Sequence, residues 1–459
     1  MRRRSSTSRR RSSMTLSGRP GEWSSSSSEH SYADSTTEEP EHAEPRSEVE
    51  SYLNASFSLP PEVAGAMLQF PVDLYLLMRK KGPASNVLLS PWYLACMMVT
   101  AYHGSSGATR LQIARALHTD DDGSIVGRLD DHASRLLGHG YRRPHHTHSG
   151  THTHNSNYTG VNVTSYFALY HDVRVKRSPD FEEPLSNMDN RLHIRDFVDN
   201  PEQCRLAMDG FFRAMAGFVF DQDVFAGDNF DSGTHLVLAS VICFSSRWFI
   251  PGNAPRSTGH FRSESVQGGS DDKVPTMCLT GSFRFAEFAD GDGFDVSVVD
   301  IPYQDPRRSI AIFLPAKSSS LEAVEKALTA AKILTCLSRL ERHRLVEVTL
   351  PRLDVKCLTD LKRTLPLLGV VEAFGNSADF SNIAPVVGLK LSAARHLAVF
   401  HAGHKGPNTV HAQVTAKEVA RSANSGSVAK FTVDRPFLFV VLVRDPDTVL
   451  LLGSVTRVV

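Results

Sequence analysis

The residues of this sequence best suited to chemistry lie in a long polar segment near the C-terminus. From Gly406 to Lys430 the chain is rich in Ser, Ala and Thr and keeps no helical or strand period. A structureless loop longer than about 12–15 residues is usually functional or disordered. Within it, Arg421 precedes Ser422. We therefore expect an exposed functional loop, with an ordinary solvated linker as the alternative.

Motifs for catalysis are missing from the sequence itself. It contains no G-x-S-x-G, Walker loop, G-x-G-x-x-G or H-E-x-x-H, so we predict a protein that is not an enzyme and needs no cofactor. The cysteines lack CxxC spacing, and several lie inside apolar runs, which predicts buried free thiols. They are Cys96, Cys204, Cys243, Cys278, Cys336 and Cys357.

A histidine-rich stretch at residues 132–158 is a second candidate for chemistry. Imidazoles at short spacing chelate zinc or copper readily. The histidines concerned are His145, His146, His148, His152 and His154. A defined site also needs fixed geometry and supporting hydrogen bonds, which a Gly/Ser/Thr-rich stretch does not supply. We therefore predict a solvated loop insertion without a metal, with a metal site as the alternative.

Charge and hydropathy argue against several partners. Lys+Arg and Asp+Glu are both 50, so the chain has no overall field for nucleic acid or an anionic membrane surface. No stretch approaches the 18 or so apolar residues of a membrane span. Residues 1–57 are rich in Ser, Arg and Glu, which predicts a disordered tail, with a localisation or phosphorylation segment as the alternative. The basic start lacks the apolar stretch of a secretory leader.

Several apolar patterns indicate the elements that would hold the polar segment. Residues 235–244 form a continuous apolar run, which predicts a central strand buried on both faces. Residues 61–78 have helical spacing, interrupted by Pro71. Directly after the polar segment, residues 436–444 and 449–453 predict two buried strands joined by a turn.

Three motifs, in this order along the chain, indicate a family. They are N-V-L-L-S-P at residues 86–91, D-L-K-R-T-L-P-L-L-G at 360–369 followed by A-D-F-S at 378–381, and F-T-V-D-R-P-F-L-F at 431–439 followed by L-L-G at 451–453. Together they resemble the serpin family of protease inhibitors, and the resemblance covers roughly residues 59–459.

The resemblance implies a serpin domain of mixed α/β (α+β) class over residues 59–459. The expected fold has a large five-stranded central sheet, eight or nine helices and an exposed reactive-centre loop at 404–433. In serpins a protease cleaves this loop, and the freed segment inserts into the main sheet as an extra strand that carries the acylated protease. By this resemblance Arg421-Ser422 is the reactive bond.

The resemblance also assigns a shutter, the place where the sheet strands part. Ser90 and His396 match the family there, whereas Tyr93 stands for a second serine and Ser240 for an asparagine. These polar groups normally form one buried hydrogen-bond network, so the energetics of opening are expected to differ in this chain.

In the breach, where insertion begins, Trp248 and Arg352 match the family, but His404 stands where a glutamate is usual. The hinge that follows departs furthest. It comprises Gly406, Pro407, Asn408, Thr409, Val410, His411, Ala412 and Gln413. Aligned on Gly406, the residues that would face the core on insertion are Pro407, Thr409, His411 and Gln413. Proline removes a ladder N–H, and buried His and Gln need polar partners, so insertion should be slow.

The expected function is therefore a monomeric bait-loop inhibitor of a trypsin-like serine protease, acting outside the cell and with reduced efficiency because of its hinge. The alternative is a non-inhibitory serpin that serves as a binding or carrier module or as a plain protease substrate.

Overall fold

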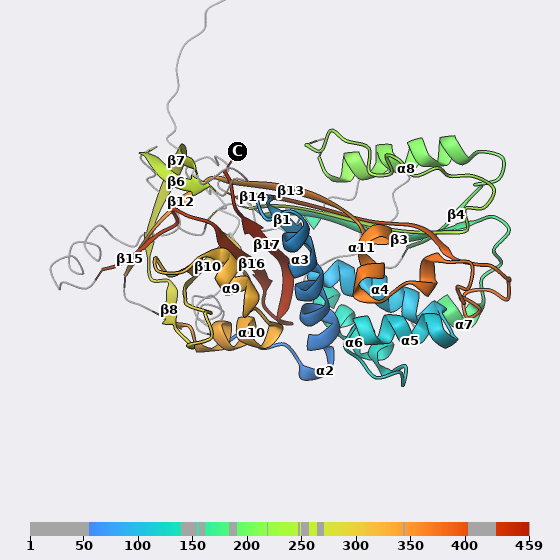
Figure 1. The fold of residues 1–459 in the computed structure, drawn as a ribbon, viewed down its shortest axis with the longest axis horizontal. Coiled ribbons are helices and arrows are strands. Elements are labelled where there is room, and N and C mark those ends of the chain that lie inside the picture. Colours follow the sequence, from blue (N-terminus) through green and yellow to red (C-terminus); the bar gives the residue numbers. More distant parts are fainter. Residues whose placement is uncertain are drawn as a thin grey trace, which may run out of the picture. The chain divides into compact units, whose positions relative to one another are not determined.

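Three β-sheets and the helices packed on them form the fold (Figure 1). The computed structural model describes residues 55–138, 154–155, 161–182, 191–217, 219–246, 248, 257–263, 270–342, 345–402 and 428–458. All of them belong to the unit Arg46–Val459.

The main sheet carries the long strands on which the rest of the site depends. Its strand order is β13-β14-β5-β3-β2, and β4 also pairs with β3. The strands are β2 (His154–Asn155), β3 (Val161–Asp172), β4 (Arg191–Arg195), β5 (Leu236–Ser246), β13 (Leu353–Asp360) and β14 (Leu391–Ala402). Among the described residues the sheet thus has one strand more than expected, because the two-residue β2 adds to the five long ones. The apolar run at 235–244 forms β5, as predicted.

Two further sheets complete the β structure. The larger has the order β1-β17-β16-β10-β9-β8-β11. Its strands are β1 (Val87–Leu89), β8 (Arg284–Phe288), β9 (Val296–Pro302), β10 (Arg308–Pro315), β11 (Glu341–Arg342), β16 (Phe437–Val443) and β17 (Thr448–Val455). The smaller has the order β15-β12-β7-β6. Its strands are β6 (Ser257–Ser263), β7 (Ser270–Gly281), β12 (Val346–Pro351) and β15 (Ala429–Thr432). The two buried strands predicted after the polar segment are β16 and β17.

The first helix shows how the sequence handles Pro71. α2 (Pro61–Ala64), the π-helix η1 (Gly65–Gln69) and α3 (Phe70–Lys81) follow without a break. The π turn ends at Gln69, two residues before Pro71. Pro71 has no N–H to donate, and the change of hydrogen-bond spacing in the π turn lets the helix continue past it. No helix in the described part of the chain is long and apolar enough to span a membrane.

The other helices are α4 (Pro91–Gly104), α5 (Gly107–Ala116), α6 (Ser124–Gly138), α7 (Pro179–Glu182), α8 (Pro201–Met215), α9 (Leu321–Lys326), α10 (Ala330–Arg339) and α11 (Leu361–Thr364), with 3-10 turns η3 (Leu365–Leu368) and η4 (Glu372–Phe374). With α2 to α3 counted as one helix, the described residues hold nine α-helices, as expected. The expected α+β class is confirmed.

The main sheet is covered on both faces (Figure 1). α8 lies over one face, where its apolar side chains join those of β3, β5 and β14 in one buried cluster. α4 lies under the other face, within the larger core that also includes the seven-stranded sheet. Successive residues of a strand point to opposite faces, so neighbouring residues of β14 meet two different environments.

The predicted end of the N-terminal tail at residue 57 is wrong. Residues 1–54 lie outside the described part, but Phe57 is 1 % exposed. The Arg444 guanidinium lies 5.1 Å from the centre of its ring, and the Ser58 N–H donates to Asp447 at 2.6 Å. Phe57 is therefore part of the folded domain, held by burial, by Arg444 and by the neighbouring Ser58 hydrogen bond.

The predicted start of the histidine-rich loop at residue 132 is also wrong. α6 runs to Gly138, and His132 is fully buried, with Nε2 2.9 Å from the Thr448 hydroxyl. Burial lowers the pKa of His132 to about 4, so this histidine is a neutral core residue. Residues 139–153 lie outside the described part, and His154–Asn155 pairs with β3 as β2.

The predicted reactive-centre loop needs one correction at its end. Residues 403–427 lie outside the described part, whereas Ala429–Thr432 forms β15 and pairs in parallel with β12. The loop is therefore bounded by the end of β14 at Ala402 and the start of β15 at Ala429.

Candidate functional site

The candidate site is the seam between β5 and β14. These strands run parallel and pair from Leu236–Leu391 to Ser246–Ala402. β3 pairs with β5, and β13 pairs with β14, in antiparallel fashion. A chain that turned back after Ala402 and entered this seam would run antiparallel to both strands. Antiparallel ladders are slightly more stable per residue than parallel ones, so one added strand would replace a single parallel ladder by two antiparallel ladders.

His396 crosses the seam on the face that α4 covers. It is the register partner of Ser240 on β5. The Ser90 backbone N–H, at the start of α4, donates to His396 Nε2 at 2.9 Å. Since Nε2 accepts, the proton belongs on Nδ1, which lies 2.7 Å from the Ser240 hydroxyl and donates to it. The structure thus brings Ser90, Ser240 and His396 into one network that ties α4 and both seam strands together.

The network is neutral and fully buried. His396 is 0 % exposed, and burial lowers its pKa to about 3, because an imidazolium there would lose its hydration. The Ser240 hydroxyl has Met97 Sδ at 3.0 Å as its own acceptor. Ser90 Oγ donates to the Leu450 carbonyl at 2.7 Å. Each polar group therefore has a partner, as a buried network requires.

Tyr93, which stands where the family has a serine, makes a separate contact. Its hydroxyl lies 2.5 Å from Ser165 Oγ on β3 and donates to it. The ring and Ser165 are both buried. Tyr93 therefore ties α4 to β3, beside the seam strand β5.

The breach residues lie at the end of the seam where the chain leaves β14. Trp248 stacks on Tyr303, with ring centres 5.0 Å apart and planes at 14°, and its indole N–H lies 3.1 Å from Met277 Sδ. The exposed Arg352 follows β12, and its backbone N–H donates to the Pro275 carbonyl at 3.3 Å. His404, the hinge at 406–413, and Arg421 and Ser422 lie outside the described residues.

Two contacts of titratable side chains at the seam strands were not found from the sequence. On β14, His401 Nδ1 lies 3.2 Å from an Asp354 oxygen on β13. Arg395 is 5 % exposed and forms ion pairs with Asp228 and Asp360. The available signal was the charge itself, because an arginine inside the apolar stretch 391–402 is rarely buried without partners.

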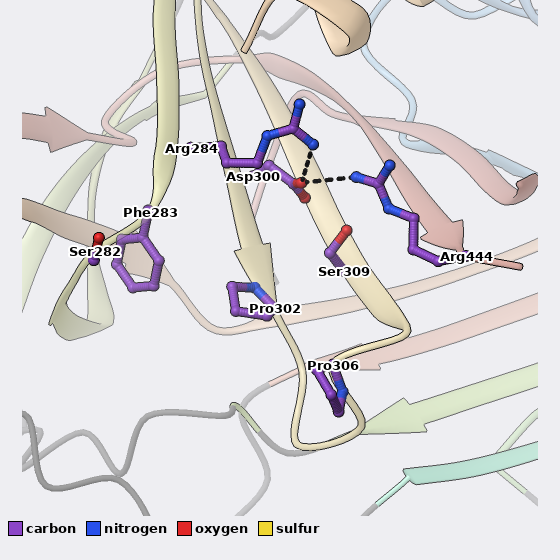
Figure 2. Close-up of a pocket in the computed structure, with 8 residues that line it drawn as sticks. All are labelled: Ser282, Phe283, Arg284, Asp300, Pro302, Pro306, Ser309 and Arg444. Atoms are coloured by element: carbon purple, nitrogen blue, oxygen red, sulfur yellow. Dashed lines mark hydrogen bonds and ion pairs between the residues drawn. The ribbon is translucent and has the colours of Figure 1, made fainter. Parts of the chain in front are cut away.

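A cavity beside the seven-stranded sheet is lined by charged residues that have a structural role. Figure 2 shows Arg284 and Arg444 converging on Asp300, at 3.8 Å and 3.2 Å. Other residues that line it are Ser282, Phe283, Pro302, Pro306 and Ser309. Arg284 also donates to the Ala55 carbonyl at 2.8 Å and to carbonyls at the end of α10. The two guanidinium groups thus anchor the first described residues. The described residues contain no group of three or more His, Cys, Asp or Glu that could hold a metal.

Comparison with known proteins identifies the family of this chain. The family model for "Serpin (serine protease inhibitor)" matches residues 66–458. The chain belongs to the serpin family.

Its relatives include Iris from Ixodes ricinus, 28 % identical over 398 residues, which is 85 % of this chain and 97 % of that protein. Neuroserpin from Rattus norvegicus is 26 % identical over 84 % of this chain and 90 % of its own length. The crystal structure of uncleaved ovalbumin has a TM-score of 0.71 at 21 % identity, covering 86 % of this chain and all of that one. Native protease nexin-1 with heparin has a TM-score of 0.68 at 20 % identity, covering 86 % and 99 %. These structures share the fold.

Proposed function

We propose that this chain is an inhibitor of serine proteases that offers residues 404–428 as bait and inserts the cleaved segment between β5 and β14. The observation that carries this proposal is the parallel pairing of β5 and β14. The bait follows Ala402, the last residue of β14, and so begins at one end of this seam. Two antiparallel ladders would replace one parallel ladder, so insertion is downhill once cleavage frees the segment. Family membership supports the same mechanism.

The proposed target is a trypsin-like protease, and the proposed reactive bond is Arg421-Ser422. An arginine at this position supplies the cation that a trypsin-like S1 pocket binds. We further propose that the protein acts outside the cell as a monomer, in keeping with the family resemblance. Gel filtration tests the monomer. Asn54 and Asn157 begin the glycosylation acceptor triplets Asn-Ala-Ser and Asn-Tyr-Thr, so glycan occupancy there in protein from a eukaryotic host tests entry into the secretory pathway.

The hinge favours a second candidate, a serpin that is cleaved without trapping. Pro407 would remove one ladder hydrogen bond, and His411 and Gln413 would enter the sheet as polar groups without assured partners. Slow insertion lets water hydrolyse the acyl-enzyme first. Such a protein would serve as a plain substrate or as a binding module.

Incubation with trypsin separates the two candidates. A trap gives an SDS-stable band near the summed masses, whereas a substrate gives only a cleaved form. We expect mostly cleavage, with a C-terminal fragment that begins at Ser422, and little covalent complex. A loop that stays intact, or cuts spread over other sites, would contradict the bait role. A near-stoichiometric complex would keep the function but show that the hinge does not limit it.

A repaired hinge sharpens the test. The variant Pro407→Thr, Thr409→Ala, His411→Ala and Gln413→Thr should raise the yield of complex several-fold. The matched control, Asn408→Ala with Val410→Ala, changes residues on the other face of the same segment and should leave the yield unchanged. If both variants behave alike, the inward-facing hinge residues do not set the outcome.

A further inference from the structure

Arg395 lies on β14 directly before His396, so its side chain points to the opposite face of the sheet. There it is buried and meets three partners. Its Nη2 lies 2.6 Å from Asp228, its Nη1 forms an ion pair with Asp360, and its Nε donates to the Val224 carbonyl at 3.2 Å. A guanidinium removed from water needs this full set of oxygens.

The partners belong to different parts of the sheet. Asp360 ends β13 and is the register partner of Arg395, so this ion pair stays within the β13–β14 side of the seam. Asp228 and Val224 belong to the segment 219–230, which follows α8. Val224, Phe225 and Phe230 share one buried cluster with residues of both seam strands. Those residues are Val237, Ala239 and Val241 of β5 and Ala393, Leu397 and Val399 of β14. The segment therefore belongs to the apolar layer that lies on both strands of the seam.

The segment is also held on the β3–β5 side. The Phe225 N–H donates to Asp209 of α8 at 2.9 Å, and Arg205 pairs with the same carboxylate at 2.7 Å. α8 packs on β3 and β5, with Phe211 against Tyr166 of β3 at 4.6 Å between ring centres. One end of the segment is thus fixed to α8, while its other attachment, through Asp228, reaches β14.

We propose that Arg395 is a positioning residue that clamps the seam shut, acting through Asp228, and so sets how fast the sheet opens to accept the loop strand. The consequence for inhibition rests on the proposed function, whereas the clamp itself does not. Admitting a strand would move β14 away from β5 by one strand spacing, about 4.8 Å. An ion pair of 2.6 Å cannot span that added distance while the segment stays seated on β5, so opening must break it.

The two carboxylates make a matched pair of variants. Asp228→Asn weakens the charged one of the two contacts from Arg395 to the segment 219–230, and Asp360→Asn weakens a contact that stays on one side of the seam. Asparagine can still cap α11 at position 360, where the Asp360 carboxylate accepts from the Arg363 N–H at 3.2 Å. Both variants leave Arg395 with one full carboxylate. Asp228→Glu restores the charge and serves as a rescue.

Hydrogen–deuterium exchange of the backbone amides in 236–246 and 391–402 reads seam opening directly, without a protease. We expect about tenfold faster exchange in both peptides for Asp228→Asn, and a change below about twofold for Asp360→Asn and Asp228→Glu, each relative to exchange in 308–315 of the seven-stranded sheet. Equal effects of the two asparagine variants, or no change in Asp228→Asn, would overturn the clamp.

A second measurement addresses the function. With the repaired hinge present, Asp228→Asn should raise the ratio of complex to cleaved product with trypsin by several-fold over Asp360→Asn. If no variant forms a complex while the exchange difference holds, the proposed inhibitory function fails and the clamp stands. Should Asp228→Asn not fold, Arg395→Lys, which keeps the charge but loses the forked geometry, must show the same faster exchange.

Discussion

Arg395 and His396 are neighbours on β14, yet they hold the same seam from its two faces by opposite means. His396 crosses it directly, with neutral hydrogen bonds to groups that are all buried and paired. Arg395 crosses it through a covering segment, with a charge that two carboxylates share. When a buried neutral group loses its hydrogen-bond partner, the cost is the desolvation of that group. When a buried ion pair loses one partner, an uncompensated charge remains, and the cost is larger. The two faces should therefore respond differently to mutation and to pH.

The largest effect on the neutral face is expected for His396→Ala. This change leaves the Ser90 N–H without its acceptor, removes the donor to the Ser240 oxygen and opens a cavity, at a cost of about 3–5 kcal/mol in the free energy of unfolding. Urea unfolding at pH 7 measures it. A loss below about 1 kcal/mol would show that water or a shifted side chain replaces the imidazole, and that the network does not hold the seam.

The extent to which the sequence anticipated this seam follows from how local each signal is. Ser90 belongs to the motif at residues 86–91, and β5 is a continuous apolar run, so both could be read from neighbouring residues, whereas His396 was assigned from the family resemblance. The clamp could not, because Asp228 and Arg395 meet only through the path of segment 219–230 across the sheet. Phe57 likewise gives no periodic signal, and its contact with Arg444 joins residues far apart in the sequence.

His132 is a residue for which the sequence predicted a loop and the structure shows a buried helix position. Its histidine-rich neighbourhood suggested a solvated loop, but Leu129, Ala133 and Leu136 place it on the apolar side of α6. The composition of the whole stretch led to the prediction of a loop, whereas helical spacing governs the residues up to Gly138. A pattern that changes within a few residues is read wrongly when one window covers both parts.

A pH titration should separate the two faces next. The folded-state pKa of His396, about 3, lies below the ordinary value of 6.5, so between these values the unfolded chain binds more protons. His396 therefore contributes stability that is fully present above pH 6.5 and lost as pH falls. From pH 7.5 to 5 the loss is about 2 kcal/mol for this residue. His132, with a pKa of about 4, adds a loss of the same sign.

Urea unfolding of His396→Gln at both pH values tests this assignment. The variant should lose about 2 kcal/mol less than the unaltered chain on acidification. On the charged face, burial raises the pKa of Asp228, so its contribution has the opposite sign, and Asp228→Asn should not reduce the acid loss. An equal acid loss in the unaltered chain and in His396→Gln would contradict the neutral, buried imidazole.

The smallest effect is expected from the contact that avoids the seam. Tyr93→Phe keeps the ring and removes only the hydroxyl that donates to Ser165, so it should cost about 1 kcal/mol in urea unfolding. Ser165→Ala should cost a similar amount. Because each change removes the same bond, the double variant should cost little more than either single one. Additive losses would mean that the two hydroxyls act through other partners.

Amide exchange gives a second test of the same variant. Since the Tyr93 hydroxyl ties α4 to β3, exchange at 391–402 in Tyr93→Phe should stay within about twofold of the unaltered chain, in contrast with the expected effect of Asp228→Asn. Faster exchange there would place α4 among the elements that hold the seam through β3, and the division between its two faces would then be incomplete.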